Sequence, residues 1–294
     1  MSNETLNETV IKANETLQLF LFYYTPCLVS LGIIGNCLSV FIFFKTKLRK
    51  HSSSYYLAAL ALSDTFNLLL YFLTWLTFLN IDLFNKPVFC EASVYLSSVG
   101  SFLSVWLVVA FTAERFFAVG YPFRRQGFDK MSHTTRAEIV ILILLLVALL
   151  IYSPCLFFAV VRDIPPRGMT CTSDLKLQQQ LNVFNTFDAL ITYAIPVIGI
   201  IILNVFIGFN MWKMAKVRKG MTYHQSSCRR KDDSAHKCKR KPTAMSQYKI
   251  TKMLLIVSTT CLCLNMPSYI MRILAGLYDV SITCARVLTR VDQA

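Results

Sequence analysis

Six blocks of mostly apolar residues alternate with polar connections along the chain. Each block is long enough to cross a bilayer as a helix, which takes roughly 20 apolar residues. The pattern therefore predicts an all-α membrane protein with six transmembrane helices. Their expected bounds are Leu19–Phe44, Tyr55–Leu79, Ala92–Val119, Ile139–Val161, Ala189–Met211 and Ile250–Leu274.

The polar segments complete this division. Residues 1–18 form a tail before the first helix, residues 19–274 hold the bundle with its loops, and residues 275–294 carry charges that oppose burial in a bilayer. Residues 213–247 are rich in Lys, Arg, Ser and Asp without an apolar period, which is typical of a mobile loop.

The composition and the placement of charge favour a membrane over other partners. Hydrophobic residues make up 55% of the chain and charged residues 16%, whereas a soluble domain carries about 25% charged residues. The formal charge of +14 could indicate nucleic-acid binding, but the basic residues gather in alternate connections, at 45–50, 124–136 and 213–249. Basic loops face the cytoplasm. The N-terminus is therefore expected outside, with the lipid bilayer and no nucleic acid as partner.

Three sequons support this orientation. Asn3, Asn7 and Asn14 each begin an Asn-x-Thr triplet, the acceptor for N-glycosylation outside the cytoplasm. No apolar stretch of a cleavable signal peptide precedes them, so the first span is expected to act as a signal anchor. Cys90 and Cys171 fall on the same, oxidising side of the membrane.

Polar residues within the spans are the first candidates for function, because burying them in a membrane is costly. Asn36 lies in the first span, Asp64 in the second, and Glu114-Arg115-Phe116 ends the third. Two plainer interpretations stay open: interhelical hydrogen bonds that fix packing, and a solvated helix boundary at Glu114-Arg115.

Taken in order, several motifs resemble the signature positions of rhodopsin-like G-protein-coupled receptors. They are Gly35-Asn36, Leu60-Ala61-Leu62-Ser63-Asp64, Cys90, Glu114-Arg115-Phe116, Cys171, Pro196 and Leu264-Asn265-Met266-Pro267. The resemblance covers about residues 19–274. It implies a rhodopsin-like helical bundle in the plasma membrane, crossing it several times, with the N-terminus extracellular.

The resemblance also implies roles for single residues. Arg115 would pair with Glu114 at rest and face a heterotrimeric G protein in the active state, with Phe123 as a second contact. Asp64 and Ser104 would bind a sodium ion near Asn36, since sodium prefers oxygen ligands.

A disulfide between Cys90 and Cys171 would tether the second extracellular loop over the ligand pocket. No cofactor is expected.

Departures from the family pattern narrow the ligand. Asn265 replaces the usual Trp, and Leu144 and Asn204 replace a Trp and a Tyr, as in some peptide-receptor branches. Amine receptors carry an Asp where this chain has Ser97, so an amine ligand is disfavoured. The overall pattern resembles invertebrate neuropeptide receptors, which implies an extracellular peptide ligand.

The candidate ligand-binding residues lie in the extracellular halves of the spans or beside the kink at Pro267. They are Trp75, Tyr95, Ser97, Ser98, Asp188, Tyr193, Asn265, Tyr269 and Arg272. Arg272 suits the carbonyl or carboxylate at a peptide C-terminus. The alternative is that Arg272 only reaches toward the membrane interface.

Three other interpretations would each require sequence features of their own. A six-span channel is disfavoured because no span has cations at helical spacing, as a voltage sensor needs, and no TVGYG filter occurs. An enzyme is disfavoured because all four histidines fall in connections and no H-E-x-x-H or G-x-S-x-G motif occurs. No seventh apolar span with Asn-Pro-x-x-Tyr follows Leu274. Two alternatives therefore stay open. The chain is a truncated product that does not signal alone and acts by associating with full-length receptors, or the sequence is incomplete.

Overall fold

The structure is a computed structural model that describes residues 3–45, 52–120, 133–165 and 168–228. Within these ranges five helical segments are long and apolar enough to cross a membrane: Glu15–Lys45, Ser52–Leu79, Phe89–Ala118, Thr134–Phe158 and Leu175–Lys213. They correspond to the first five predicted spans. The sixth, Ile250–Leu274, lies outside the described residues.

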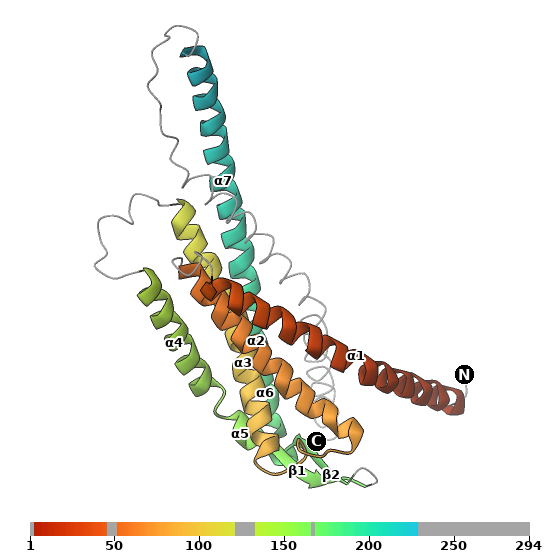
Figure 1. Cartoon of the computed structure of the whole chain (residues 1–294). Helices are drawn as coiled ribbons and strands as arrows, with labels where there is room; N and C mark the ends of the chain where they lie inside the picture. The colour runs from red at the N-terminus through yellow and green to blue at the C-terminus, as the bar shows by residue number, and fades with distance from the viewer. Residues whose placement is uncertain (1–2, 46–51, 121–132, 166–167, 229–294) are drawn as a thin grey trace, which may run out of the picture. The chain divides into compact units, whose positions relative to one another are not determined.

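The first half of the chain is built from four long helices (Figure 1). They are α1 (Asn3–Lys45), α2 (Ser52–Trp75), α3 (Phe89–Gly120) and α4 (His133–Ile151), and the 3-10 turn η2 (Leu76–Leu79) extends α2. Helix α1 begins well before the predicted start at Leu19, so its first turns include the polar residues that the sequence assigned to a tail.

A β-hairpin follows the fourth span and corrects the prediction there. Helix α4 ends at Ile151, a short helix α5 (Cys155–Phe158) follows, and Ala159–Asp163 form strand β1 rather than the end of a helix. Pro154, which lacks a backbone N–H, separates α4 from α5 and so interrupts the helical ladder. Strand β1 pairs antiparallel with β2 (Met169–Ser173).

The hairpin is tied to the helices and to itself. Cys171 of β2 forms a disulfide with Cys90 at the start of α3, which confirms the predicted pair. The backbone N–H of Cys171 also donates to Asn85 Oδ1 at 3.0 Å. Arg162 of β1 forms an ion pair with Asp174, the residue that follows β2.

The fifth span consists of three segments in series. After the turn η4 (Leu175–Leu177) come α6 (Gln178–Asp188), the π-helix η5 (Ala189–Ala194) and α7 (Ile195–Cys228). Helix α7 continues to Cys228, so the first half of the predicted loop 213–247 is helical. The reason is that these residues include several good helix formers and no Pro. The rest of that loop lies outside the described residues.

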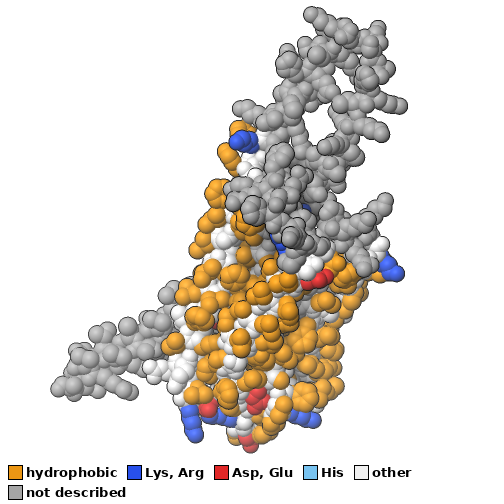
Figure 2. Space-filling model, turned by 90° about the vertical axis from the view of Figure 1, so that its left-hand side faces the viewer, with side chains coloured by type: hydrophobic (Ala, Val, Ile, Leu, Met, Phe, Trp, Pro, Cys, Tyr) orange, Lys and Arg blue, Asp and Glu red, His pale blue; other side chains and the backbone are white. Residues whose placement is uncertain are grey.

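Two compact units divide the chain, one from residues 1–107 and 133–184, the other from residues 108–132 and 185–294. In the first unit, α2 packs against both α1 and α4. Hydrophobic side chains cover most of the described surface in view in Figure 2. Leu31 and Leu150, for example, are 71% and 75% exposed. Such surface suits contact with lipid tails, because an aqueous protein rarely exposes large apolar patches.

Candidate functional site

A cluster of polar groups joins α2 to α3 in the first unit. Ser104 Oγ donates to Asp64 Oδ1 at 2.6 Å and lies 3.3 Å from Ser63 Oγ. Ser63 Oγ donates to the carbonyl of Gly100 at 3.1 Å. The structure therefore brings together Asp64 and Ser104, the two residues for which the sequence predicted a shared site.

The hydroxyl oxygens of the cluster have free acceptor lone pairs, and its carboxylate has no cationic partner among the described residues. Each hydroxyl has one proton, so Ser104 and Ser63 keep lone pairs after donating to Asp64 and Gly100. Within the described part of the chain, no Lys or Arg forms an ion pair with Asp64. Hard oxygen donors around one carboxylate fit a small monovalent cation such as sodium better than a divalent ion, which usually takes several carboxylates.

The third residue expected at this site takes no part in the cluster. Asn36 is half-buried on α1, and no hydrogen bond among the described residues joins it to Asp64 or Ser104. Its role as a neighbour of the cation stays a prediction. Across the same ranges, no three His, Cys, Asp or Glu side chains gather to hold a metal.

A second charged cluster lies in the second unit, where α3 ends. Arg115 is 6% exposed. Its Nη2 lies 3.9 Å from Glu114 Oε1, and its Cζ lies 5.9 Å from the centroid of the Phe111 ring. Phe116 contacts Phe206 of α7, with ring centroids 6.0 Å apart. The arrangement holds a buried guanidinium between a carboxylate and an aromatic face, both of which stabilise its charge.

Two candidate ligand-binding residues use their polar atoms to join helices. Trp75 Nε1 donates to the carbonyl of Phe22 in α1 at 2.9 Å, and the Trp75 ring stacks on Phe72. Tyr95 Oη donates to the carbonyl of Leu149 in α4 at 3.0 Å. Their donors are therefore engaged within the bundle, which leaves a ligand their rings and the acceptor lone pairs of Tyr95 Oη.

The adjacent serines bond within their own helix. Ser97 and Ser98 both donate to the carbonyl of Val94, at 3.0 and 2.9 Å. Ser98 Oγ also lies 4.0 Å from the sulfur of Cys155, a buried thiol at the start of α5. These hydroxyls keep their acceptor lone pairs, so they can receive a hydrogen bond from a ligand without losing the one they make.

The remaining described candidates lie beside the π-helix of the second unit. Asp188 accepts a hydrogen bond from Thr192 Oγ1 at 2.8 Å, and Tyr193 is buried. A π-turn adds one residue to a helical turn and often occurs at functional sites. Sequence reasoning missed Thr192, although its position four residues after Asp188 places both on one helix face.

Some of the predicted residues take no part in the clusters above. Phe123, Asn265, Tyr269 and Arg272 lie outside the described residues. The three sequon asparagines fall in the first turns of α1, and their glycosylation stays a prediction.

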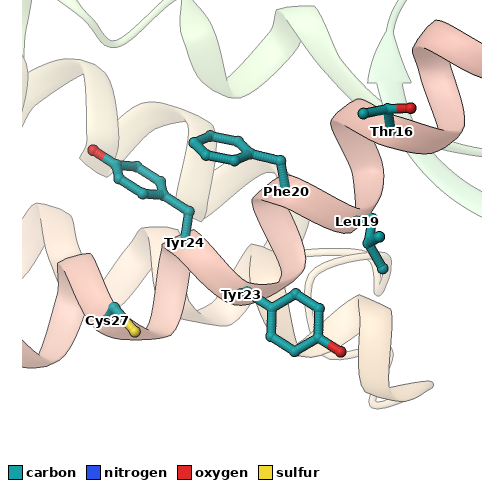
Figure 3. Close-up of a pocket in the computed structure, with 6 residues that line it drawn as sticks. All are labelled: Thr16, Leu19, Phe20, Tyr23, Tyr24 and Cys27. Carbon is teal, nitrogen blue, oxygen red and sulfur yellow. The ribbon is translucent and has the colours of Figure 1, made fainter.

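A surface hollow on α1 is unrelated to these clusters (Figure 3). Its lining comes from a single helix: Thr16, Leu19, Phe20, Tyr23, Tyr24 and Cys27. The rings of Phe20 and Tyr24 stack with centroids 5.1 Å apart. The Thr16 hydroxyl already donates to the carbonyl of Lys12. A groove along one apolar helix face lacks the convergent polar groups that orient a small ligand.

Comparisons with known proteins agree with these features. Residues 35–291 match the family model described as "7 transmembrane receptor (rhodopsin family)". Rat somatostatin receptor type 4 is 27% identical over 86% of the chain and 59% of the receptor. Bovine thyrotropin-releasing hormone receptor is 24% identical over 91% of the chain and 71% of the receptor. Mouse probable G-protein coupled receptor 174 is 28% identical over 65% of the chain and 55% of the receptor. The chain thus spans little more than half the length of the rat and mouse receptors.

Proposed function

The chain belongs to the rhodopsin family of seven-transmembrane receptors, and on that premise we propose that it binds an extracellular peptide and activates a heterotrimeric G protein. It is a multi-pass membrane protein, and its family consists of receptors rather than enzymes. The proposed location is the plasma membrane with the N-terminus outside, as the basic connections and the sequons predict.

The cytoplasmic end of α3 carries the proposal of G-protein activation. Arg115 is buried beside Glu114, with 3.9 Å between Nη2 and Oε1, and this is the single observation on which the proposal rests most. A guanidinium has five donors and stays charged. Once released from Glu114, Arg115 can bond to backbone carbonyls of a partner helix, and Phe123 is proposed as a second, apolar contact.

Two lines of support favour a peptide ligand. Two of the relatives are receptors for somatostatin and thyrotropin-releasing hormone, as their names state. This chain also has Ser97, a neutral residue, where amine receptors hold an acid. In the second unit, Asp188 offers a carboxylate to a basic group of the ligand, and Arg272 is proposed for the opposite end of the peptide.

The α2–α3 cluster is proposed as a regulatory cation site. Asp64, Ser104 and Ser63 would supply the oxygens, and a bound sodium ion would neutralise the carboxylate. Ser104 orients the carboxylate by donating to Oδ1, while Ser63 fixes α2 to the backbone of α3. The cluster thus links the charge state of the site to the spacing of these two helices.

The test is ligand-stimulated nucleotide exchange in membranes from cells that express the chain. Amidated and free-acid neuropeptides are screened beside amines, nucleotides and lipids. We expect one peptide class to bind saturably and to stimulate exchange. Saturable binding of an amine or a nucleotide, with no peptide competing for it, would overturn the ligand assignment.

A further inference from the structure

The side-chain amide oxygen of Asn67 in α2 is buried at the contact between two helices. This Oδ1 atom is completely buried and accepts no hydrogen bond from the part of the chain that the structure describes. Asn67 lies three residues after Asp64, and residues at this spacing share a helix face. The amide therefore lies about one helical turn from Asp64, on the same face of α2.

The surroundings of the amide place it at the α2–α3 contact. A Cβ added to Gly100 of α3 would collide with the side-chain amide of Asn67. The Gly100 carbonyl is the group to which Ser63 donates at 3.1 Å. Because Gly100 has no side chain, the Asn67 amide fits directly against α3, within the set of residues that includes Asp64 and Ser104.

A buried carbonyl oxygen in a membrane protein needs a partner. Leaving such a group unpaired costs free energy, since neither lipid nor apolar side chains can donate to it. A second need lies close by, because the described helices provide no cation to pair with Asp64. One cation would meet both needs, whereas a water molecule would satisfy the amide and leave the carboxylate charge unbalanced.

We infer that Asn67 Oδ1 is a further ligand of the monovalent cation held by Asp64, so that α2 supplies a carboxylate and an amide oxygen from one face. The inference rests on the cation site proposed above. It also assigns Gly100 a role: a larger residue there would displace the amide and weaken the site without removing any ligand atom.

The test measures cation binding through protein stability rather than signalling. The thermal unfolding midpoint of the purified chain is followed as sodium replaces N-methylglucamine at constant ionic strength. A ligand that binds only the folded state raises the midpoint with its concentration. Wild type should show a saturable rise, and Asp64→Asn should show none.

The variants of the amide decide the inference. Asn67→Ala should need about three- to tenfold more sodium for the same rise, the effect of losing one polar contact. Asn67→Asp keeps the oxygen and should retain the rise. Gly100→Ala should behave like Asn67→Ala, whereas Gly35→Ala, which has nothing within 4 Å of its added Cβ, should match wild type.

The possible failures are distinguishable. If Asn67→Ala gives the wild-type titration while Asp64→Asn abolishes it, the cation site stands and Asn67 is not a ligand, its oxygen being met by water. If wild type itself shows no response to sodium, both the cation site and the inference are overturned. If Asn67→Ala does not fold, the Gly100→Ala titration decides: a response at wild-type sodium concentrations in Gly100→Ala would contradict the inference.

Discussion

Asp64 in α2 and Arg115 in α3 are both ionisable side chains in helices that cross the membrane, but their surroundings differ in charge. Asp64 accepts a hydrogen bond from the neutral hydroxyl of Ser104 at 2.6 Å. Arg115 has the carboxylate of Glu114 at 3.9 Å and the face of Phe111 at 5.9 Å. Among the described residues, an ionised Asp64 therefore has no counter-charge, whereas Arg115 is paired with one.

This difference indicates what each cluster responds to. A charge in a membrane is costly without a counter-charge, and the described residues supply none to Asp64. The Asp64 cluster should therefore depend on a cation from solution. The Arg115 cluster already contains its counter-charge. Only a partner that offers better hydrogen bonds can separate the pair, so this cluster should depend on a protein and hardly on the kind of salt.

The largest expected effect comes from removing the guanidinium. In a receptor that contains this chain, Arg115→Ala should lower ligand-stimulated nucleotide exchange by about 100-fold, the loss expected for two hydrogen bonds from a charged donor. Ligand affinity should stay within a few-fold, and the sodium response should not change. Lys213→Ala, which removes an exposed cation of α7, serves as control. Unchanged exchange in Arg115→Ala would contradict the role assigned to it.

The apolar blocks of the sequence predicted where the helices lie better than where each helix begins and ends. The second and third spans match α2 and α3 within a few residues, because their apolar blocks end in polar turns. The predicted fourth span extends too far at its C-terminal end. Hydropathy does not distinguish the β-branched residues Val160 and Val161 of strand β1 from residues of a helix. Helices α1 and α7 extend beyond the apolar blocks, because the adjacent polar residues favour helix and continue its backbone hydrogen bonds.

The site was predictable where a family resemblance supplied long-range contacts. It implied the Cys90–Cys171 disulfide and the meeting of Asp64 with Ser104, and both occur. Asn67 was missed because no local pattern tells which residue of α3 faces it. The donors of Trp75 and Tyr95 point to backbone carbonyls of α1 and α4, a direction that position in the sequence does not fix.

A smaller effect should follow from loss of the hydroxyl that orients Asp64. Ser104→Ala removes the donor to Oδ1, and a hydrogen bond between membrane helices contributes about 0.6 kcal/mol on average and up to about 1.7 kcal/mol. We therefore expect about three- to tenfold more sodium to be needed for the same thermal stabilisation. Ser39→Ala is the matched control, because that hydroxyl donates to the Gly35 carbonyl of its own helix. Equal titrations for both variants would show that Ser104 does not support the site.

The smallest effect should come from neutralising the partner of Arg115. Glu114→Gln keeps the shape of the side chain and removes its charge. The two side chains are 15% and 7% exposed, and the atoms of the pair are 3.9 Å apart. At this separation the pair lacks the hydrogen bond of a close ion pair. Loss of this restraint should therefore raise nucleotide exchange without ligand by about two- to fivefold, equivalent to roughly 0.4–1 kcal/mol.

Its control is the same substitution on an exposed acid. Glu138→Gln of α4 should leave exchange unchanged. The sodium response of Glu114→Gln should match that of wild type, since the charge of Glu114 pairs with Arg115 and not with the Asp64 site. A sodium titration that shifts in Glu114→Gln, with exchange unchanged, would mean that the pair does not restrain Arg115 and that the two clusters share their charge balance. The contrast between them would then be wrong.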